Sequence, residues 1–326
     1  MLATGGFGAV YEAEDLQQRR SVALKLMFLE TEGFPVLAAR MEREGQLGRH
    51  LSHPNLVRAF DHGSTEEGCP FVVTELIPGR TLRDLMREGP LPAARALQIA
   101  RQLFEAIRAC HELGVIHRDL KPRNVMVDDA SHDHLTVIDF GLAKLPPRLL
   151  DPVGHIDADI ADDLSPYKKL TEDGVVFGTL AYMAPETSQG MDAVDARSDL
   201  YAAGVMLYEL LTGKHPFDVT DPAELFHHHR SVPPPPFAKR APEVVVPVAL
   251  EALVMRLLQK SQSDRYGSAA EVLASLTLMD RPLAPARRAS TTWQNLLERL
   301  RPRSRVAVTL VIAIVTLALL RALTSS

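Results

Sequence analysis

The sequence contains only two cysteines, Cys69 and Cys110, among its 326 residues. Two thiols so far apart are too few for a disulfide framework or a zinc site, so we expect reduced thiols in a cytosolic environment, with Cys110 in the core. The N-terminus lacks the charged segment and apolar run of a signal peptide. Positive charge is scarce as well: the part before Arg281 carries 28 basic and 40 acidic residues, which argues against nucleic-acid binding.

The most informative stretch is His117-Arg118-Asp119-Leu120-Lys121-Pro122-Arg123-Asn124. Short apolar runs flank it at residues 114–116 and 125–127, and a third run, 135–138, ends in Asp139-Phe140-Gly141. The stretch resembles the catalytic loop H-R-D-x-x-x-x-N of protein kinases. An ordinary polar loop is the alternative, and the flanking apolar runs argue against it.

The resemblance assigns roles to residues of this loop and of the run that follows it. Asp119 would accept the proton of the substrate hydroxyl group, and Lys121 would stabilise charge on the transferring phosphoryl group. Asn124 and Asp139 would bind Mg²⁺ or Mn²⁺, with ATP as the phosphoryl donor.

The N-terminal part resembles the nucleotide-binding half of the same family. The glycine cluster of residues 4–8 matches the family's phosphate-binding loop in part, although Ala3 stands where the first glycine belongs and the first strand is apparently truncated. The run Val22-Ala23-Leu24-Lys25 resembles the V-A-I-K strand, and Glu44, rather than Glu42, is the expected partner of its lysine. The implied ATP-binding residues are Leu2, Gly5, Gly6, Gly8, Val10, Ala23, Lys25, Glu44, Thr74, Glu75 and Ile77, with Thr74 as gatekeeper.

A long segment of 42 residues separates Gly141 from Ala184-Pro185-Glu186, which resembles the end of an activation segment. Its acidic, proline-containing insertion, residues 145–173, lacks the spacing of a calcium-binding loop and is expected to be mobile. By resemblance, Thr179 selects aliphatic hydroxyl groups. Arg118 would gather a phosphate on Thr171, with Ser165 as second choice and an unmodified Thr171 as the alternative.

Three further residues have structural roles by resemblance. Asp199 would hold the main chain of the catalytic loop, and Glu186 would form a buried ion pair with Arg265.

The triplet His227-His228-His229 is a poor chelate because adjacent residues on a helix face different directions, so we interpret it as a solvated loop.

The C-terminal part contains a basic linker, residues 280–305, followed by an apolar run. Residues 306–320 include thirteen apolar residues and two threonines, and extension to residue 324 gives ~28 Å of helix against a ~30 Å hydrocarbon core. We expect a single transmembrane helix at 306–324, with the catalytic part on the cytoplasmic side because arginines precede the span. A helix buried against a partner is the alternative.

Taken together, the sequence predicts an α+β, bilobal protein kinase fold over residues 1–279, with a β-rich N-lobe at about 1–77 and a larger helical C-lobe at about 78–279. It resembles most the bacterial transmembrane Ser/Thr kinases of the eukaryotic-like family. That resemblance implies phosphorylation of protein Ser and Thr, autophosphorylation, the lipid bilayer as a partner, a possible homodimer and no nucleic acid. The alternatives are a catalytically weak pseudokinase scaffold and a small-molecule phosphotransferase, which would lack Lys121 and the runs at Thr179 and Glu186.

Overall fold

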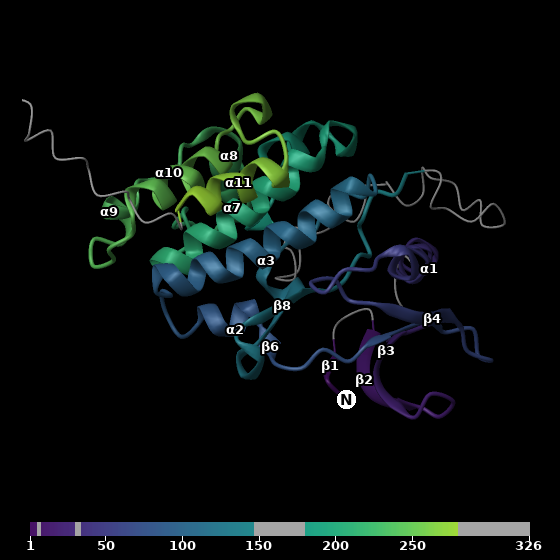
Figure 1. Ribbon diagram of the computed structural model, residues 1–326. Coiled ribbons are helices and arrows are strands. Elements are labelled where there is room, and N and C mark those ends of the chain that lie inside the picture. Colours follow the sequence, from purple (N-terminus) through teal and green to yellow (C-terminus); the bar gives the residue numbers. More distant parts are fainter. Residues whose placement is uncertain (5–7, 30–33, 147–179, 280–326) are drawn as a thin grey trace, which may run out of the picture. The chain divides into compact units, whose positions relative to one another are not determined.

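The computed structural model describes residues 1–4, 8–29, 34–146 and 180–279 (Figure 1). The predictions for Gly5, Gly6, Ser165, Thr171, Thr179, most of the acidic insertion, the basic linker and the span at 306–324 lie outside the described residues.

The first part of the chain is a five-stranded antiparallel sheet with one helix. The sheet order is β1-β2-β3-β5-β4. The strand bounds are Ala3–Thr4 (β1), Gly8–Asp15 (β2), Arg20–Met27 (β3), Ala59–Ser64 (β4) and Pro70–Glu75 (β5). The predicted short first strand has two residues, and Leu2 N–H continues its pairing by donating to the Val10 carbonyl.

Helix α1 (Phe34–His50) lies against β4 and β5 (Figure 1). Two glycines allow this close approach. A Cβ atom at Gly45 would lie 2.4 Å from the His62 side chain, and one at Gly48 would lie 2.4 Å from the Cβ of Ala59. Larger residues at either position would therefore push α1 away from β4, and with it the side chains that α1 carries.

The second part is mostly helical, as the sequence predicts. Its helices are α2 (Leu82–Met86), α3 (Ala93–Glu112), α7 (Ala196–Thr212), α8 (Pro222–Ser231), α9 (Phe237–Arg240), α10 (Val248–Leu257) and α11 (Ala269–Met279). The predicted apolar stripe of α3 is buried, including Leu103, Phe104, Ile107 and Cys110. Helix α7 is buried along nearly its whole length, from the cap at Asp195 to the left-handed Gly213, and contacts α3 and α10.

A small three-stranded sheet carries the catalytic-loop stretch. Strands β6 (Arg80–Thr81), β7 (Val125–Asp128) and β8 (His134–Val137) are antiparallel in that order. The apolar runs 125–127 and 135–138 thus form strands as expected. The run 114–116 does not, because Gly114 turns the chain at φ +75° after α3, and only Ile116 makes a single bridge, to Lys144.

The interpretation of the histidine triplet as a solvated loop is wrong. All three residues lie in α8, and the His229 side chain is buried against Tyr201 of α7.

In the part of the chain that the structure describes, no three His, Cys, Asp or Glu side chains are arranged to hold a metal ion. Of the helices described, none is both long enough and apolar enough to cross a bilayer.

Candidate active site

Lys25 links the first sheet to the second part of the chain. Its Nζ lies 2.7 Å from Glu44 Oε2 on α1 and 3.4 Å from Asp139 Oδ1, which follows β8. The Glu44 side chain is only 8% exposed, so water reaches its carboxylate poorly. The Lys25 ammonium group lies close enough to balance the charge of that carboxylate. The structure thus joins Lys25 to Glu44, the residue chosen from the sequence, whereas Glu42 accepts a hydrogen bond from Gln46.

Charge balance in this triad favours an ionised Asp139. Burial alone would raise the pKa of the Asp139 carboxyl group, but the Lys25 ammonium group and the Gly141 N–H outweigh it and lower that pKa to about 2. For Lys25 the effect of burial has the opposite sign, because burial alone would lower the pKa of its ammonium group. The carboxylates of Asp139 and Glu44 outweigh burial and raise that pKa above its usual value. At neutral pH the triad therefore presents a fixed ammonium group beside a carboxylate.

Asp119 lies in a second set of contacts, within the catalytic loop. Lys121 Nζ is 2.7 Å from Asp119 Oδ2, and Asn124 Nδ2 donates to the same oxygen at 3.1 Å and to the Asp119 carbonyl at 2.9 Å. Asn124 also connects the two sets, because its carbonyl accepts from Ile138 N–H, next to Asp139, at 2.8 Å. Lys121 is close enough to Asp139 to contribute to its lowered pKa.

Two oxygen donors in this arrangement fit a divalent cation. The amide nitrogen of Asn124 is engaged by Asp119, so its oxygen is the atom that can face a metal, and Asp139 supplies an ionised carboxylate. Hard cations such as Mg²⁺ prefer oxygen ligands and are held by one or two protein groups together with substrate phosphates. The two residues predicted to bind Mg²⁺ are therefore of the right chemical type, and the hydrogen bond from Ile138 N–H to the Asn124 carbonyl links their segments.

The main chain of the catalytic loop is held by a buried carboxylate of α7. Asp199 accepts from the amides of His117 at 2.9 Å and Arg118 at 3.0 Å, and it bonds to His111 Nε2 at 2.8 Å. Burial would raise the pKa of Asp199, but the hydrogen bond from His111 and the neighbouring His117 lower it. Arg118 has φ +64° and Asp139 has φ +66°, so backbone strain lies next to Asp119 and at Asp139 itself.

Four of the predicted nucleotide-binding residues of the sheet, Val10, Ala23, Lys25 and Thr74, share one face. Val10 pairs with Lys25 and Ala23 pairs with Thr74, and residues directly opposite one another in an antiparallel pair project to the same side. Gly8 has no room for a side chain, since a Cβ atom would lie 2.2 Å from the Leu26 carbonyl oxygen. Leu2 immediately precedes β1, whose Ala3 pairs with Val10, and Glu75 and Ile77 follow Thr74 along the chain.

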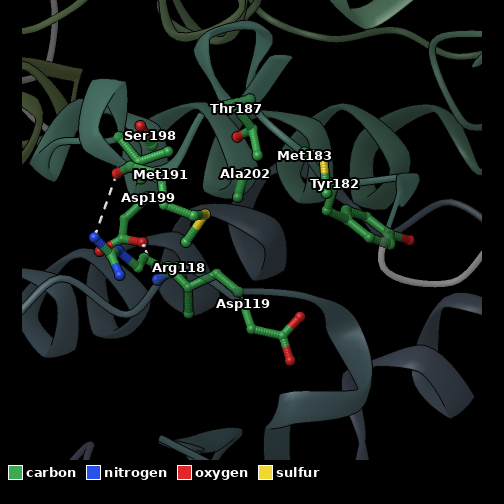
Figure 2. A pocket seen from close by; sticks show the side chains of 12 residues that line it. Arg118, Asp119, Tyr182, Met183, Thr187, Met191, Ser198, Asp199 and Ala202 are labelled. Carbon is green, nitrogen blue, oxygen red and sulfur yellow. Dashed lines mark hydrogen bonds between the residues drawn. The ribbon is translucent and has the colours of Figure 1, made fainter. Parts of the chain in front are cut away.

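An open pocket adjoins Asp119 (Figure 2). Its walls come from the catalytic loop, from residues 182–184 and from the start of α7, and the Asp119 carboxylate points away from that of Asp199. Behind these walls, Glu186 accepts from Arg265 at 2.8 and 2.7 Å. This is the ion pair predicted from the sequence, and both side chains are almost completely buried.

Several residues at the site were not identified from the sequence. His111 supports Asp199, the His117 ring packs on Phe140 at 4.9 Å between centroids, and Glu209 bonds to both Tyr182 and Arg83. His117 belongs to the H-R-D motif, and Glu209 is the single carboxylate in the apolar half of α7, so each carried a signal in the sequence. His111 carried none.

Comparisons with known proteins give one consistent result. A sequence model described as protein kinase domain matches residues 1–276. The serine/threonine-protein kinase pkn3 of Myxococcus xanthus is 36% identical over 284 residues, which cover 86% of this chain and 49% of that protein. The serine/threonine-protein kinase PknB of Mycobacterium leprae is 35% identical over 281 residues, covering 85% of this chain and 41% of that protein. The chain thus spans about half of these relatives' length or less.

The fold has a solved counterpart. A crystal structure of the Mycobacterium tuberculosis PknI kinase domain, carrying a single substitution, superposes with a TM-score of 0.59 at 24% identity. The superposition covers 85% of this chain and 92% of that one.

Proposed function

The chain belongs to the protein kinase family, and we propose that it transfers the γ-phosphoryl group of ATP to Ser and Thr hydroxyl groups of proteins. The observation that carries this proposal is the convergence of Lys25, Asp119, Asn124 and Asp139 through two connected sets of contacts. These are the groups that phosphoryl transfer needs: a cation for the phosphates, two oxygen ligands for Mg²⁺ and a carboxylate for the acceptor hydroxyl.

Each residue then has a task that its contacts support. Lys25 holds the phosphates of the nucleotide and is itself positioned by Glu44. Asp119 accepts the proton of the acceptor hydroxyl group, and Lys121, 2.7 Å from it, offers positive charge where the phosphoryl oxygens gain negative charge. Asn124 and Asp139 would hold Mg²⁺, which when bound neutralises phosphate charge. Asp199 keeps the loop in the orientation that aims Asp119.

A direct assay separates this activity from a pseudokinase scaffold. The full chain is incubated with γ-labelled ATP, Mg²⁺ and casein, and phosphoamino acids are identified. We expect label on Ser and Thr and none on Tyr, and Asp119→Asn is expected to lower transfer by about 10² to 10⁴ because it removes the proton acceptor. Asp61→Asn, on the exposed edge of β4, is the matched control. A wild-type chain that binds ATP but labels nothing is a pseudokinase.

We further propose that residues 306–324 anchor the chain in a membrane as a single span, with the kinase domain cytoplasmic. The support is the length and apolar composition of this stretch and the arginines at 299, 301, 303 and 305. Sodium carbonate extraction of cell membranes tests the anchor: the full chain should stay in the pellet, and a chain ending at residue 305 should be released. Equal release of both chains would contradict it. A homodimer and an activating phosphate on Thr171 remain predictions.

A further inference from the structure

The main chain at Ala181 is hydrogen-bonded to a histidine that has no role in the activity described so far. Ala181 precedes Tyr182, Met183 and Ala184, which form a wall of the pocket beside Asp119 (Figure 2). The Ala181 carbonyl oxygen lies 2.7 Å from Nε2 of His215. His215 belongs to the turn that follows α7, 34 residues farther along the chain.

The two ring nitrogens of His215 contact Ala181 and Phe217. A carbonyl oxygen can only accept, so Nε2 carries the proton and donates it to Ala181. The other nitrogen, Nδ1, lies 3.0 Å from the Phe217 carbonyl oxygen and 3.2 Å from the Phe217 N–H. Both ring nitrogens are thereby used, and the ring is oriented by its own turn. A hydrogen bond from Arg240 also stabilises this turn, because Arg240 Nε donates to the His215 carbonyl at 2.9 Å.

A buried cluster from α7 and α8 supports the histidine from behind. The His229 ring lies 5.7 Å from that of His215 and 5.0 Å from that of Phe217, between centroids, and it bonds to the Tyr201 hydroxyl at 3.0 Å. Burial and the nearby His215 and Lys260 side chains hold the pKa of His229 well below its usual value. The Ala181 carbonyl has the opposite effect and raises this pKa, but by less. His229 is therefore a neutral, buried ring that leaves His215 little freedom to turn away.

The wall of the pocket is held from its other side as well. The Tyr182 hydroxyl donates to Glu209, which accepts from Arg83 of α2 at 2.8 Å, and the Tyr182 ring meets the His215 ring edge to face at 6.0 Å. Glu209 thus fixes the side chain of residue 182, whereas His215 fixes the main chain one residue earlier. Between these anchors the wall has a defined position relative to Asp119.

We propose that His215 is a positioning residue for the acceptor protein: by donating to the Ala181 carbonyl it sets the wall 182–184 against which the acceptor segment binds. This inference rests on the proposed kinase activity. It concerns binding of the acceptor and leaves the nucleotide site, built from Lys25, Glu44 and Asp139, unaffected.

Two substitutions at one position separate the two contacts of the ring. In His215→Gln the side-chain amide nitrogen reaches the place of Nε2 and can still donate to Ala181. In His215→Asn it reaches only the place of Nδ1, so the bond to Ala181 is lost. His227→Asn, on the exposed side of α8, is the matched control for the same exchange elsewhere. The kinetics use the full chain and the Ser/Thr peptide that the wild-type chain labels best in a mixed library.

For His215→Asn we expect the KM for the peptide to rise about threefold to tenfold, as the loss of one hydrogen bond predicts, with the KM for ATP unchanged. His215→Gln and His227→Asn should stay within about twofold of the wild type. Equal peptide KM values for the Asn and Gln variants, or a parallel rise in the KM for ATP, would overturn the proposal.

Hydrogen exchange gives a readout that does not require turnover. Met183 N–H donates to the Leu180 carbonyl at 3.2 Å and closes the turn that contains Ala181. In His215→Asn this amide should exchange faster than in the wild type and in His215→Gln; unchanged exchange would overturn the role of His215. A wild-type chain that labels no peptide would refute the kinase activity instead, and the exchange rates would still decide whether His215 holds the wall.

Discussion

Replacing Arg265 by Met should destabilise the protein more than any exposed ion-pair substitution. All five N–H donors of the Arg265 guanidinium group have acceptors. Two bonds go to the Glu186 carboxylate at 2.8 and 2.7 Å, and three go to main-chain carbonyls of Gln259, Arg197 and Lys260 at 2.8 to 3.1 Å. The Arg265 side chain is 0% exposed, and that of Glu186 is 4% exposed.

The expected loss of unfolding free energy follows from the polar groups that Arg265→Met leaves without a partner. Met fills much of the same volume, so the loss is mainly electrostatic. Glu186 would keep only the hydrogen bond from the Ser198 hydroxyl group, and three carbonyls would lose a donor. Breaking a buried pair by removing one partner costs about 3–5 kcal/mol, a large part of a typical stability of about 5–15 kcal/mol.

Urea unfolding followed by far-UV circular dichroism measures the effect. Arg108→Met is the control, since Arg108 pairs with Glu105 and Glu112 on the exposed side of α3 and should lose less than about 1 kcal/mol. The double variant with Glu186→Gln should recover part of the loss, because no buried charge is then left unpaired. A loss in Arg265→Met no larger than that in Arg108→Met would refute the reasoning.

Two further predictions concern the active site. Glu44→Gln removes one charge of the pair with Lys25 and should lower kcat/KM for ATP by about 10-fold to 100-fold, whereas Glu42→Gln should leave it nearly unchanged; equal effects in a steady-state assay would show that Glu44 has no special role. Asp199 has a folded-state pKa below its usual value, so its stabilising effect is complete above about pH 4 and is lost as pH falls through the folded-state pKa. The free energy of unfolding of Asp199→Asn, measured from pH 2 to 6, should therefore depend less on pH than that of the wild type, and identical slopes would contradict this account.

The order of the motifs along the chain, and their resemblance to a known family, were enough to predict the fold and the ion pairs Lys25–Glu44 and Arg265–Glu186. Lys25, Asp119, Asn124 and Asp139 were assigned by resemblance to the motifs of protein kinases, and the structure joins Lys25 to Asp139 across 114 positions. The choice of Glu44 over Glu42 also came from the resemblance, because in similar kinases the pairing glutamate lies about nine residues before the His-Pro pair, here His53-Pro54. Such residues are identifiable because their chemistry requires a fixed residue type at a fixed separation along the chain.

What the sequence did not reveal depends on contacts between distant elements. His111 meets Asp199 across 88 positions and His215 meets Ala181 across 34, and neither histidine has a local pattern around it. The triplet 227–229 was misinterpreted for a related reason. On a helix, three successive residues cover about 200° of the circumference, so one of them faces whatever the helix packs against. Here that residue is His229, and only the position of α7 decides it.

Backbone strain next to Asp119 and at Asp139 has a structural source. A non-glycine residue with positive φ costs about 1–2 kcal/mol, and both Arg118 and Asp139 adopt this conformation. Asp199 offsets the first cost, because a hydrogen bond to a charged group stabilises by about 1.5–3 kcal/mol and Asp199 accepts two from the loop. Lys25 and the Gly141 N–H offset the second. The two strained residues are thus held by different parts of the chain: the orientation of Asp119 depends on α7, whereas that of Asp139 depends on β3. A change that displaced Lys25 would therefore release Asp139 while leaving the catalytic loop in place.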